Sequence, residues 1–212
     1  MASEALKIQD PPAGTRAAVD GGRRGVITLA RHGEPALSRR IKLDAAGYRR
    51  WWALYEEGGL LQGQIPPRHL QATAEAAGVI VASTRRRSIE TAQAVACGRA
   101  FSQDPLFIEA PLPPPSWPSA FKFSPRAWGV IARLWWWFFD HNEGQESRAE
   151  AQVRAEEAAR LLDGLAENGQ DVLVLAHGFF NTMIGIELKE LGWRCVKDQG
   201  FKYWSARSFE RV

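Results

Sequence analysis

The sequence has little cysteine and no long apolar segment. Its two cysteines, Cys97 and Cys195, are too few for a disulfide framework and lack the spacing of a zinc site, which favours free thiols in a reducing compartment. No apolar run approaches the roughly 20 residues that a membrane-spanning helix needs, and no early stretch resembles a signal peptide. We therefore expect a cytoplasmic protein without stable membrane insertion.

A strong excess of one charge is also missing. The 212 residues include 27 Lys and Arg and 24 Asp and Glu, and the two signs are interspersed along most of the chain. This balance suits a small anionic substrate and argues against a nucleic acid partner. The pattern contains neither the carboxylate clusters typical of magnesium sites nor the His and Cys spacing of zinc sites, so we expect no metal and no cofactor.

The distribution of apolar residues predicts an α/β fold. Residues 1–23 mix proline and glycine with charges and are expected to form a flexible tail, which leaves 24–212 as a single domain. Strand-like runs at Val26–Ala30, Val79–Ala82 and Val172–Ala176 alternate with helical patterns. Those patterns cover Ala45–Glu57, Thr84–Cys97, Ser147–Asn168 and Phe179–Leu191. The alternation predicts a three-layer sandwich, in which helices cover both faces of a mostly parallel sheet. A short strand near Tyr203–Glu210 is expected to close one edge.

A cap insertion is predicted at about residues 110–146. Six prolines in Asp104–Pro118 indicate a strand end that runs into an extended loop, and the helix Arg126–Phe139 is apolar nearly all round. We expect its aromatic rings to pack the cap onto the core. Two alternatives stay open: an aromatic wall for the substrate, and a membrane-surface or homodimer contact through Trp135–Trp137.

The string Arg31-His32-Gly33-Glu34 follows the first strand directly. Ligand sites of open α/β sheets lie at the carboxyl ends of strands. A guanidinium can bind phosphoryl oxygens, an imidazole can attack phosphorus, and Gly33 would let the backbone approach a ligand. The string therefore indicates a phosphoryl site.

Two later strand ends carry matching residues. Ser83 ends the second strand and Arg87 follows one helical turn later, so that its side chain can point back toward the strand ends; Arg85 and Arg86 are interpreted as solvated surface charges. The third strand ends in His177-Gly178. Two of the four histidines thus stand at strand ends before a glycine, and this repeated context favours a functional role for both.

These motifs resemble those of the histidine phosphatase superfamily, which is also called phosphoglycerate mutase-like. The Arg-His-Gly-Glu string, Ser83 with Arg87 and Thr91-Ala92, and His177-Gly178 follow the family order over about residues 24–191. The resemblance implies that His32 is the nucleophile of a metal-independent phosphomonoester hydrolase and forms a phosphohistidine. The other ring N–H of His32 then needs an acceptor, for which a backbone carbonyl is expected.

The resemblance also assigns roles around the phosphoryl group. It implies that Arg31, Arg87 and His177 surround that group, that Glu109 is the proton donor with Glu34 as competitor, and that the substrate is a small phosphorylated molecule. Glu109 follows Leu106–Ile108, which are expected to end a short strand. Further contacts to phosphate or substrate are expected from Gly33, Glu34, Ser38 and Gly178.

Departures from the family pattern limit the function. Ser38 stands where many relatives have asparagine, and Arg85 stands where an apolar residue is usual. Glu109 is followed by Ala-Pro-Leu-Pro-Pro-Pro rather than the Arg-His-Tyr-Gly of phosphoglycerate mutases, which favours hydrolysis. Mutase-type phosphotransfer, and a non-catalytic phosphate-binding or docking module that uses the aromatic insert, remain the alternatives.

Overall fold

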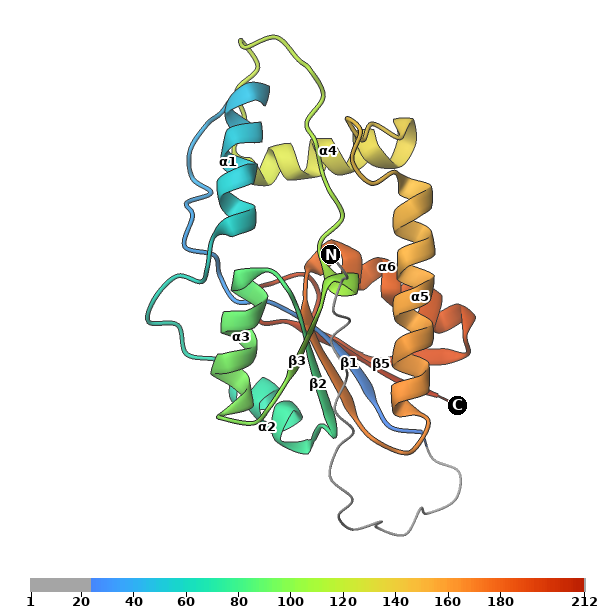
Figure 1. Cartoon of the computed structure of the whole chain (residues 1–212). Helices are drawn as coiled ribbons and strands as arrows, with labels where there is room; N and C mark the ends of the chain where they lie inside the picture. The colour runs from blue at the N-terminus through green and yellow to red at the C-terminus, as the bar shows by residue number, and fades with distance from the viewer. Residues whose placement is uncertain (1–23, 212) are drawn as a thin grey trace, which may run out of the picture.

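A single six-stranded sheet organises residues 24–211, which are the residues that the computed structural model describes (Figure 1). The predicted tail 1–23 lies outside them. The strands are β1 Ile27–Arg31, β2 Val79–Ser83, β3 Ser102–Asp104, β4 Val172–Ala176, β5 Trp193–Asp198 and β6 Ala206–Arg211. Their order across the sheet is β3-β2-β4-β1-β6-β5; the first four are parallel, and β6 and β5 continue the sheet in antiparallel pairing.

Helices cover both faces, as the sequence predicts (Figure 1). They are α1 Ala45–Glu57, α2 Arg68–Ala76, α3 Arg86–Ala96, α4 Pro125–Phe139, α5 Arg148–Ala166 and α6 Gly178–Glu190, with a 3-10 turn η1 at Pro105–Phe107. Side chains of a strand alternate between faces. Val172 and Val174 of β4 accordingly join the core formed with α5 and α6, whereas Leu173 and Leu175 join the core formed with α2 and α3. The predicted three-layer architecture is confirmed.

Four details differ from the sequence predictions. Helix α2 was not expected, because its nine residues bury only Leu70 and Ala74 and so show little periodicity. Strand β5 was not expected either, and it forms the edge that had been assigned to the last strand; β6 lies between β1 and β5. Residues 106–108 form no strand, because the Asp104 side chain accepts the Leu106 N–H and starts the 3-10 turn η1.

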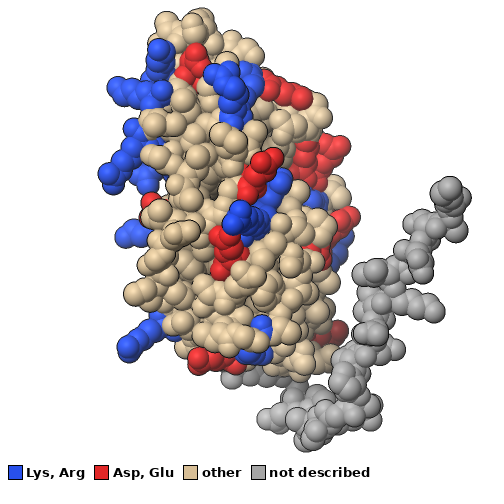
Figure 2. All heavy atoms as spheres, turned by 60° about the vertical axis from the view of Figure 1, so that its left-hand side comes forward, with Lys and Arg blue, Asp and Glu red and all other residues tan. Residues whose placement is uncertain are grey.

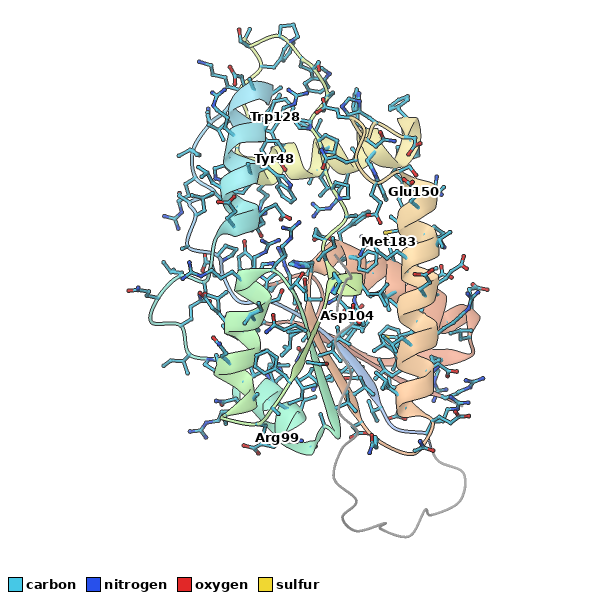
Figure 3. The ribbon with its side chains drawn as sticks, viewed as in Figure 1. Tyr48, Arg99, Asp104, Trp128, Glu150 and Met183 are labelled. Carbon is cyan, nitrogen blue, oxygen red and sulfur yellow. The ribbon has the colours of Figure 1, made fainter. Side chains whose placement is uncertain are left out.

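The cap has a core of its own. Figure 3 shows Tyr48 of α1 and Trp128 of α4 close together between their helices. Both side chains are fully buried, their rings stack at 5.9 Å between centroids, and the Trp128 indole donates to the Leu43 carbonyl at 2.6 Å. The predicted insertion therefore supplies α4, while the first long helix supplies the other half of the cap.

The aromatic run of α4 is divided between the interior and the surface. Trp136 is fully buried, whereas Leu134, Phe138 and Phe139 are 47%, 70% and 69% exposed. The buried face of α4 packs onto the core, as expected for the insert. A homodimer through the exposed face remains a prediction. None of the helices within residues 24–211 is both long and apolar enough to cross a membrane.

Truncating Trp128 should destabilise the cap strongly. We expect Trp128→Ala to lower the free energy of unfolding by about 3–5 kcal/mol, because a large buried ring and its hydrogen bond are lost together. Leu134→Ala, on the exposed face of the same helix, should change it by less than about 0.5 kcal/mol. Urea unfolding followed by circular dichroism measures both, and equal losses would contradict this account of the cap core.

Candidate active site

Two strand ends bring His32 and His177 together. Arg31 at the end of β1 pairs in register with Ala176 at the end of β4, so the next residue of each strand lies at the same edge. The His32 N–H donates to the Ala176 carbonyl at 3.0 Å, and the two imidazole rings meet edge to face at 5.3 Å. Both rings are buried. The predicted convergence of the histidine motifs is confirmed.

The His32 ring is oriented by the residue that follows it. Its Nδ1 lies 2.7 Å from the Gly33 carbonyl oxygen. A carbonyl only accepts, so Nδ1 must carry the proton, and in a neutral ring Nε2 then holds the free lone pair. The expected backbone acceptor is present.

Ser83 and Arg87 converge on His177. Ser83 Oγ lies 3.0 Å from His177 Nε2, and Arg87 Nη2 lies 3.4 Å from His177 Nδ1. Because a guanidinium only donates, Nδ1 faces it as an acceptor and Nε2–H donates to the hydroxyl. The prediction that Arg87 points back toward the strand ends is confirmed.

The buried Arg87 side chain is held by helix α1. Its Nη1 donates to the Tyr55 carbonyl at 2.9 Å, its Nη2 pairs with Glu56 at 2.8 Å, and its guanidinium lies 4.5 Å from the Tyr55 ring centroid. Arg85 pairs with the other oxygen of Glu56 at 2.7 Å, so its interpretation as a solvated charge is wrong. Arg86 is exposed and pairs with Glu90 one turn later, as expected for a surface charge.

Arg31 is packed between β1 and the loop that precedes β6. Its guanidinium donates to the Phe201 carbonyl and lies 4.5 Å from the Tyr203 ring centroid. A Cβ at Gly178 would come within 3.1 Å of the Arg31 side chain. The glycine at the start of α6 thus makes room for the arginine.

Gly33 makes room for a ring rather than for a ligand. A Cβ there would lie 2.3 Å from the Trp204 indole, and the Gly33 N–H donates to Thr91 Oγ1 at 3.0 Å. We expected Gly33 to let a ligand approach the backbone, but the Trp204 indole occupies the space beside it.

The two candidate proton donors occupy different environments. Glu109 is buried, its Oε1 accepts the Phe180 N–H of α6 at 2.9 Å, and its charge acts on Arg31. Glu34 is exposed, and its backbone is held by Gln64. Ser38 is also exposed, in a neighbouring pocket of about 640 Å³ that Glu34 also lines. Glu109 is thus buried against the start of α6, whereas Glu34 and Ser38 are exposed.

Sequence reasoning missed the residues that hold this site in place. Tyr203 stacks near both Arg31 and His32, with its ring 5.9 Å from the imidazole, and Trp204 covers Gly33. Glu56 balances the charge of Arg87. None belongs to a local motif; the only signal was a cluster of aromatic residues before the last strand.

Burial among cations sets the protonation of the histidines. Desolvation, followed by the charges of Arg87 and Arg31, holds the pKa of His32 well below its usual range. Desolvation and the Arg87 charge do the same to the pKa of His177. Both rings are therefore neutral at pH 7, and His32 Nε2 keeps an unprotonated lone pair. In residues 24–211 no group of three or more His, Cys, Asp or Glu side chains is placed to hold a metal ion.

A protein-family model matches most of the chain and shows the family to which it belongs. The model of the histidine phosphatase superfamily (branch 1) matches residues 27–202. The chain belongs to this superfamily. No curated protein matches it.

Solved structures share the fold at low identity. A mycobacterial glucosyl-3-phosphoglycerate phosphatase is 20% identical with a TM-score of 0.52, covering 88% of this chain and 89% of that one. A phosphoserine phosphatase mutant from Entamoeba histolytica is 17% identical with a TM-score of 0.51, covering 78% and 80%. The ecdysone phosphate phosphatase of the silkworm Bombyx mori is 16% identical with a TM-score of 0.53, covering 87% and 88%. At such identities these proteins show the common fold.

The lowered histidine pKa values can be measured by NMR. Imidazole signals of His32 and His177 should keep their neutral shifts while a free imidazole compound in the same buffer becomes protonated, because a depressed pKa extends the neutral form to lower pH. His69→Gln and His141→Gln, which lie outside the site, assign the remaining two signals by elimination. A midpoint for His32 at or above that of the free compound would refute the electrostatic description.

Proposed function

We propose that this chain is a phosphomonoester hydrolase that works through a phosphohistidine intermediate on His32. The observation that carries the proposal is the contact of His32 Nδ1 with the Gly33 carbonyl. It assigns the proton to Nδ1 and leaves Nε2 as the nucleophilic atom. Arg31, Arg87 and His177 supply the surroundings that a transferring phosphoryl group requires.

In the first half-reaction the lone pair of His32 Nε2 forms a bond to phosphorus. The phosphorus–oxygen ester bond breaks, its electron pair stays on the leaving oxygen, and Glu109 gives that oxygen a proton. Arg31 and Arg87 neutralise the equatorial phosphoryl oxygens, and His177 donates to one of them after its N–H turns from Ser83. One oxygen of Glu109 is engaged by the Phe180 N–H, which leaves the other to carry the proton.

In the second half-reaction water replaces the alcohol. The Glu109 carboxylate accepts a proton from the water as its oxygen bonds to phosphorus. The phosphorus–nitrogen bond then breaks, and its electron pair returns to His32 Nε2. Inorganic phosphate leaves, and both catalytic groups regain their starting protonation.

Hydrolysis is favoured over the mutase alternative by the segment after Glu109. Leu112 and the prolines at 113–115 are buried there, and residues 110–115 contain no Lys or Arg in place of the Arg-His-Tyr-Gly of the mutases. The named structural neighbours are phosphatases as well, although their substrates differ. The class of reaction is therefore better supported than any individual substrate.

Removal of the nucleophile is the first test. We expect His32→Ala to lower the release of inorganic phosphate from para-nitrophenyl phosphate by roughly a thousandfold or more, without added metal, because no other side chain is placed to take its role. Acid-labile phosphohistidine should be trapped in the wild type alone. Unchanged turnover in the variant would refute the mechanism, and a wild type without turnover would favour the non-catalytic phosphate-binding module. Transfer of the phosphoryl group to a second substrate without phosphate release would favour the mutase.

Substrates whose leaving groups differ in their need for a proton identify the residue that donates it. With benzyl phosphate, whose alkoxide leaves poorly, Glu109→Gln should lower kcat by about 10²-fold to 10⁴-fold. The loss should be much smaller with para-nitrophenyl phosphate, because nitrophenolate leaves without a proton. Glu34→Gln is the matched control and should show no such dependence. The reverse pattern would assign proton donation to Glu34.

A further inference from the structure

A second pocket opens beside the candidate active site. It has a volume of about 500 Å³ and reaches Arg31 and Gly178, which belong to the site itself. The rest of its wall comes from the cap helix α4, the loop before β6, Phe179 of α6, and Arg39 between β1 and α1. Its cationic lining residues are Arg31, Arg39, Arg126, Arg133 and Lys202, and no Asp or Glu lines it.

These five cations have no carboxylate partner. Among the ion pairs of residues 24–211 none includes any of them, although arginines elsewhere are paired, such as Arg24 with Asp163 and Arg154 with Glu146. In Figure 2, Lys and Arg side chains gather along one edge of the face drawn, while Asp and Glu lie mostly elsewhere on it. Unbalanced like charges in one pocket repel each other, and a bound anion relieves that repulsion.

Two of the cations are held in place by neutral neighbours. Arg39 Nη1 donates to the Tyr203 hydroxyl at 2.7 Å, and its buried Nε has no partner. Arg133 lies 5.2 Å from the Phe179 ring centroid and donates to the Gly129 carbonyl at 3.2 Å. Neither contact neutralises a charge, so both guanidinium groups keep N–H donors for an anion. Because the two side chains are already held in place, binding an anion would cost little further side-chain entropy.

We infer that the substrate carries a second anionic group, a carboxylate or another phosphate, that binds in this pocket while its phosphoryl ester lies at His32. The inference rests on the proposed function and narrows its substrate class. Arg31 lies at the boundary of the two sites, so the two anionic groups belong to one small molecule. Val130, Phe179 and Phe201 form the apolar part of the wall and suit a carbon skeleton between the two groups.

A pair of isosteric esters tests the second anion. Para-carboxybenzyl phosphate and para-carbamoylbenzyl phosphate have nearly the same shape, and a methylene insulates the leaving oxygen from the substituent. The wild type should hydrolyse the acid with a kcat/KM about tenfold or more above that of the amide, because a carboxylate makes charge-assisted hydrogen bonds. A benzyl phosphate with a second phosphate group at the para position extends the comparison from a carboxylate to a phosphate.

Charge removal locates the preference. Arg126→Gln and Lys202→Gln alter exposed side chains, and combined with Arg133→Gln they should bring the ratio of acid to amide close to one. Arg68→Gln removes an exposed charge at the start of α2, outside this pocket, and should keep the full ratio. Higher salt should lower the ratio in the wild type, since screening weakens partly exposed charge pairs.

Binding separates this inference from the hydrolase assignment. The corresponding benzylphosphonates cannot be hydrolysed, so calorimetry measures their Kd whether or not the protein turns over. Tighter binding of the acid, lost in the triple variant, supports the pocket even if neither ester is cleaved, in which case the hydrolase proposal fails. Equal Kd and equal kcat/KM for acid and amide, or a preference that survives the triple variant, overturns the inference.

Discussion

The burial of the Arg87 charge is the constraint on which the rest of the site depends. A guanidinium with no exposed surface is costly unless a carboxylate and further acceptors surround it. Glu56 and the Tyr55 carbonyl meet that need, and both belong to the carboxyl-terminal turn of α1. Because Arg87 belongs to α3, these contacts connect the cap helix α1 to the helix that follows β2.

The same charge determines how the histidines behave. Arg87 adjoins His177, which in turn meets the ring of His32, so burial and a cation act on both imidazoles together. A neutral His32 ring with an unprotonated Nε2 follows from this arrangement and from the Gly33 carbonyl that fixes its tautomer. Burial and the neighbouring cations disfavour a proton on either ring, and the same cations would attract the phosphoryl dianion of the proposed reaction.

The motifs at strand ends could be predicted because their meaning is local. An apolar run that is followed by a charged residue and glycine indicates the end of a strand. The parallel register of β1 and β4 then places His32 beside His177. Ser147 and Glu150 likewise form a capping box at the start of α5, which is a local sequence pattern. The positions of Glu56 and Tyr203 depend on long-range packing of α1 and the β5–β6 hairpin, which no periodicity encodes. The 3-10 turn η1 replaces the strand end that we predict over Leu106–Ile108, because the Asp104 side chain caps it and Pro105 begins it.

The proposed chemistry and the proposed substrate preference lie in different parts of this fold. His32 and His177 follow the ends of parallel strands, whose register tolerates little displacement. Three cations of the second pocket, Arg126, Arg133 and Lys202, come from α4 and the β5–β6 loop, and two of them, Arg126 and Lys202, are exposed. Replacing them would change the preferred substituent without disturbing the sheet. These charges are exposed and make no ion pair within residues 24–211, and this is the physical basis on which we propose that the pocket binds an anion.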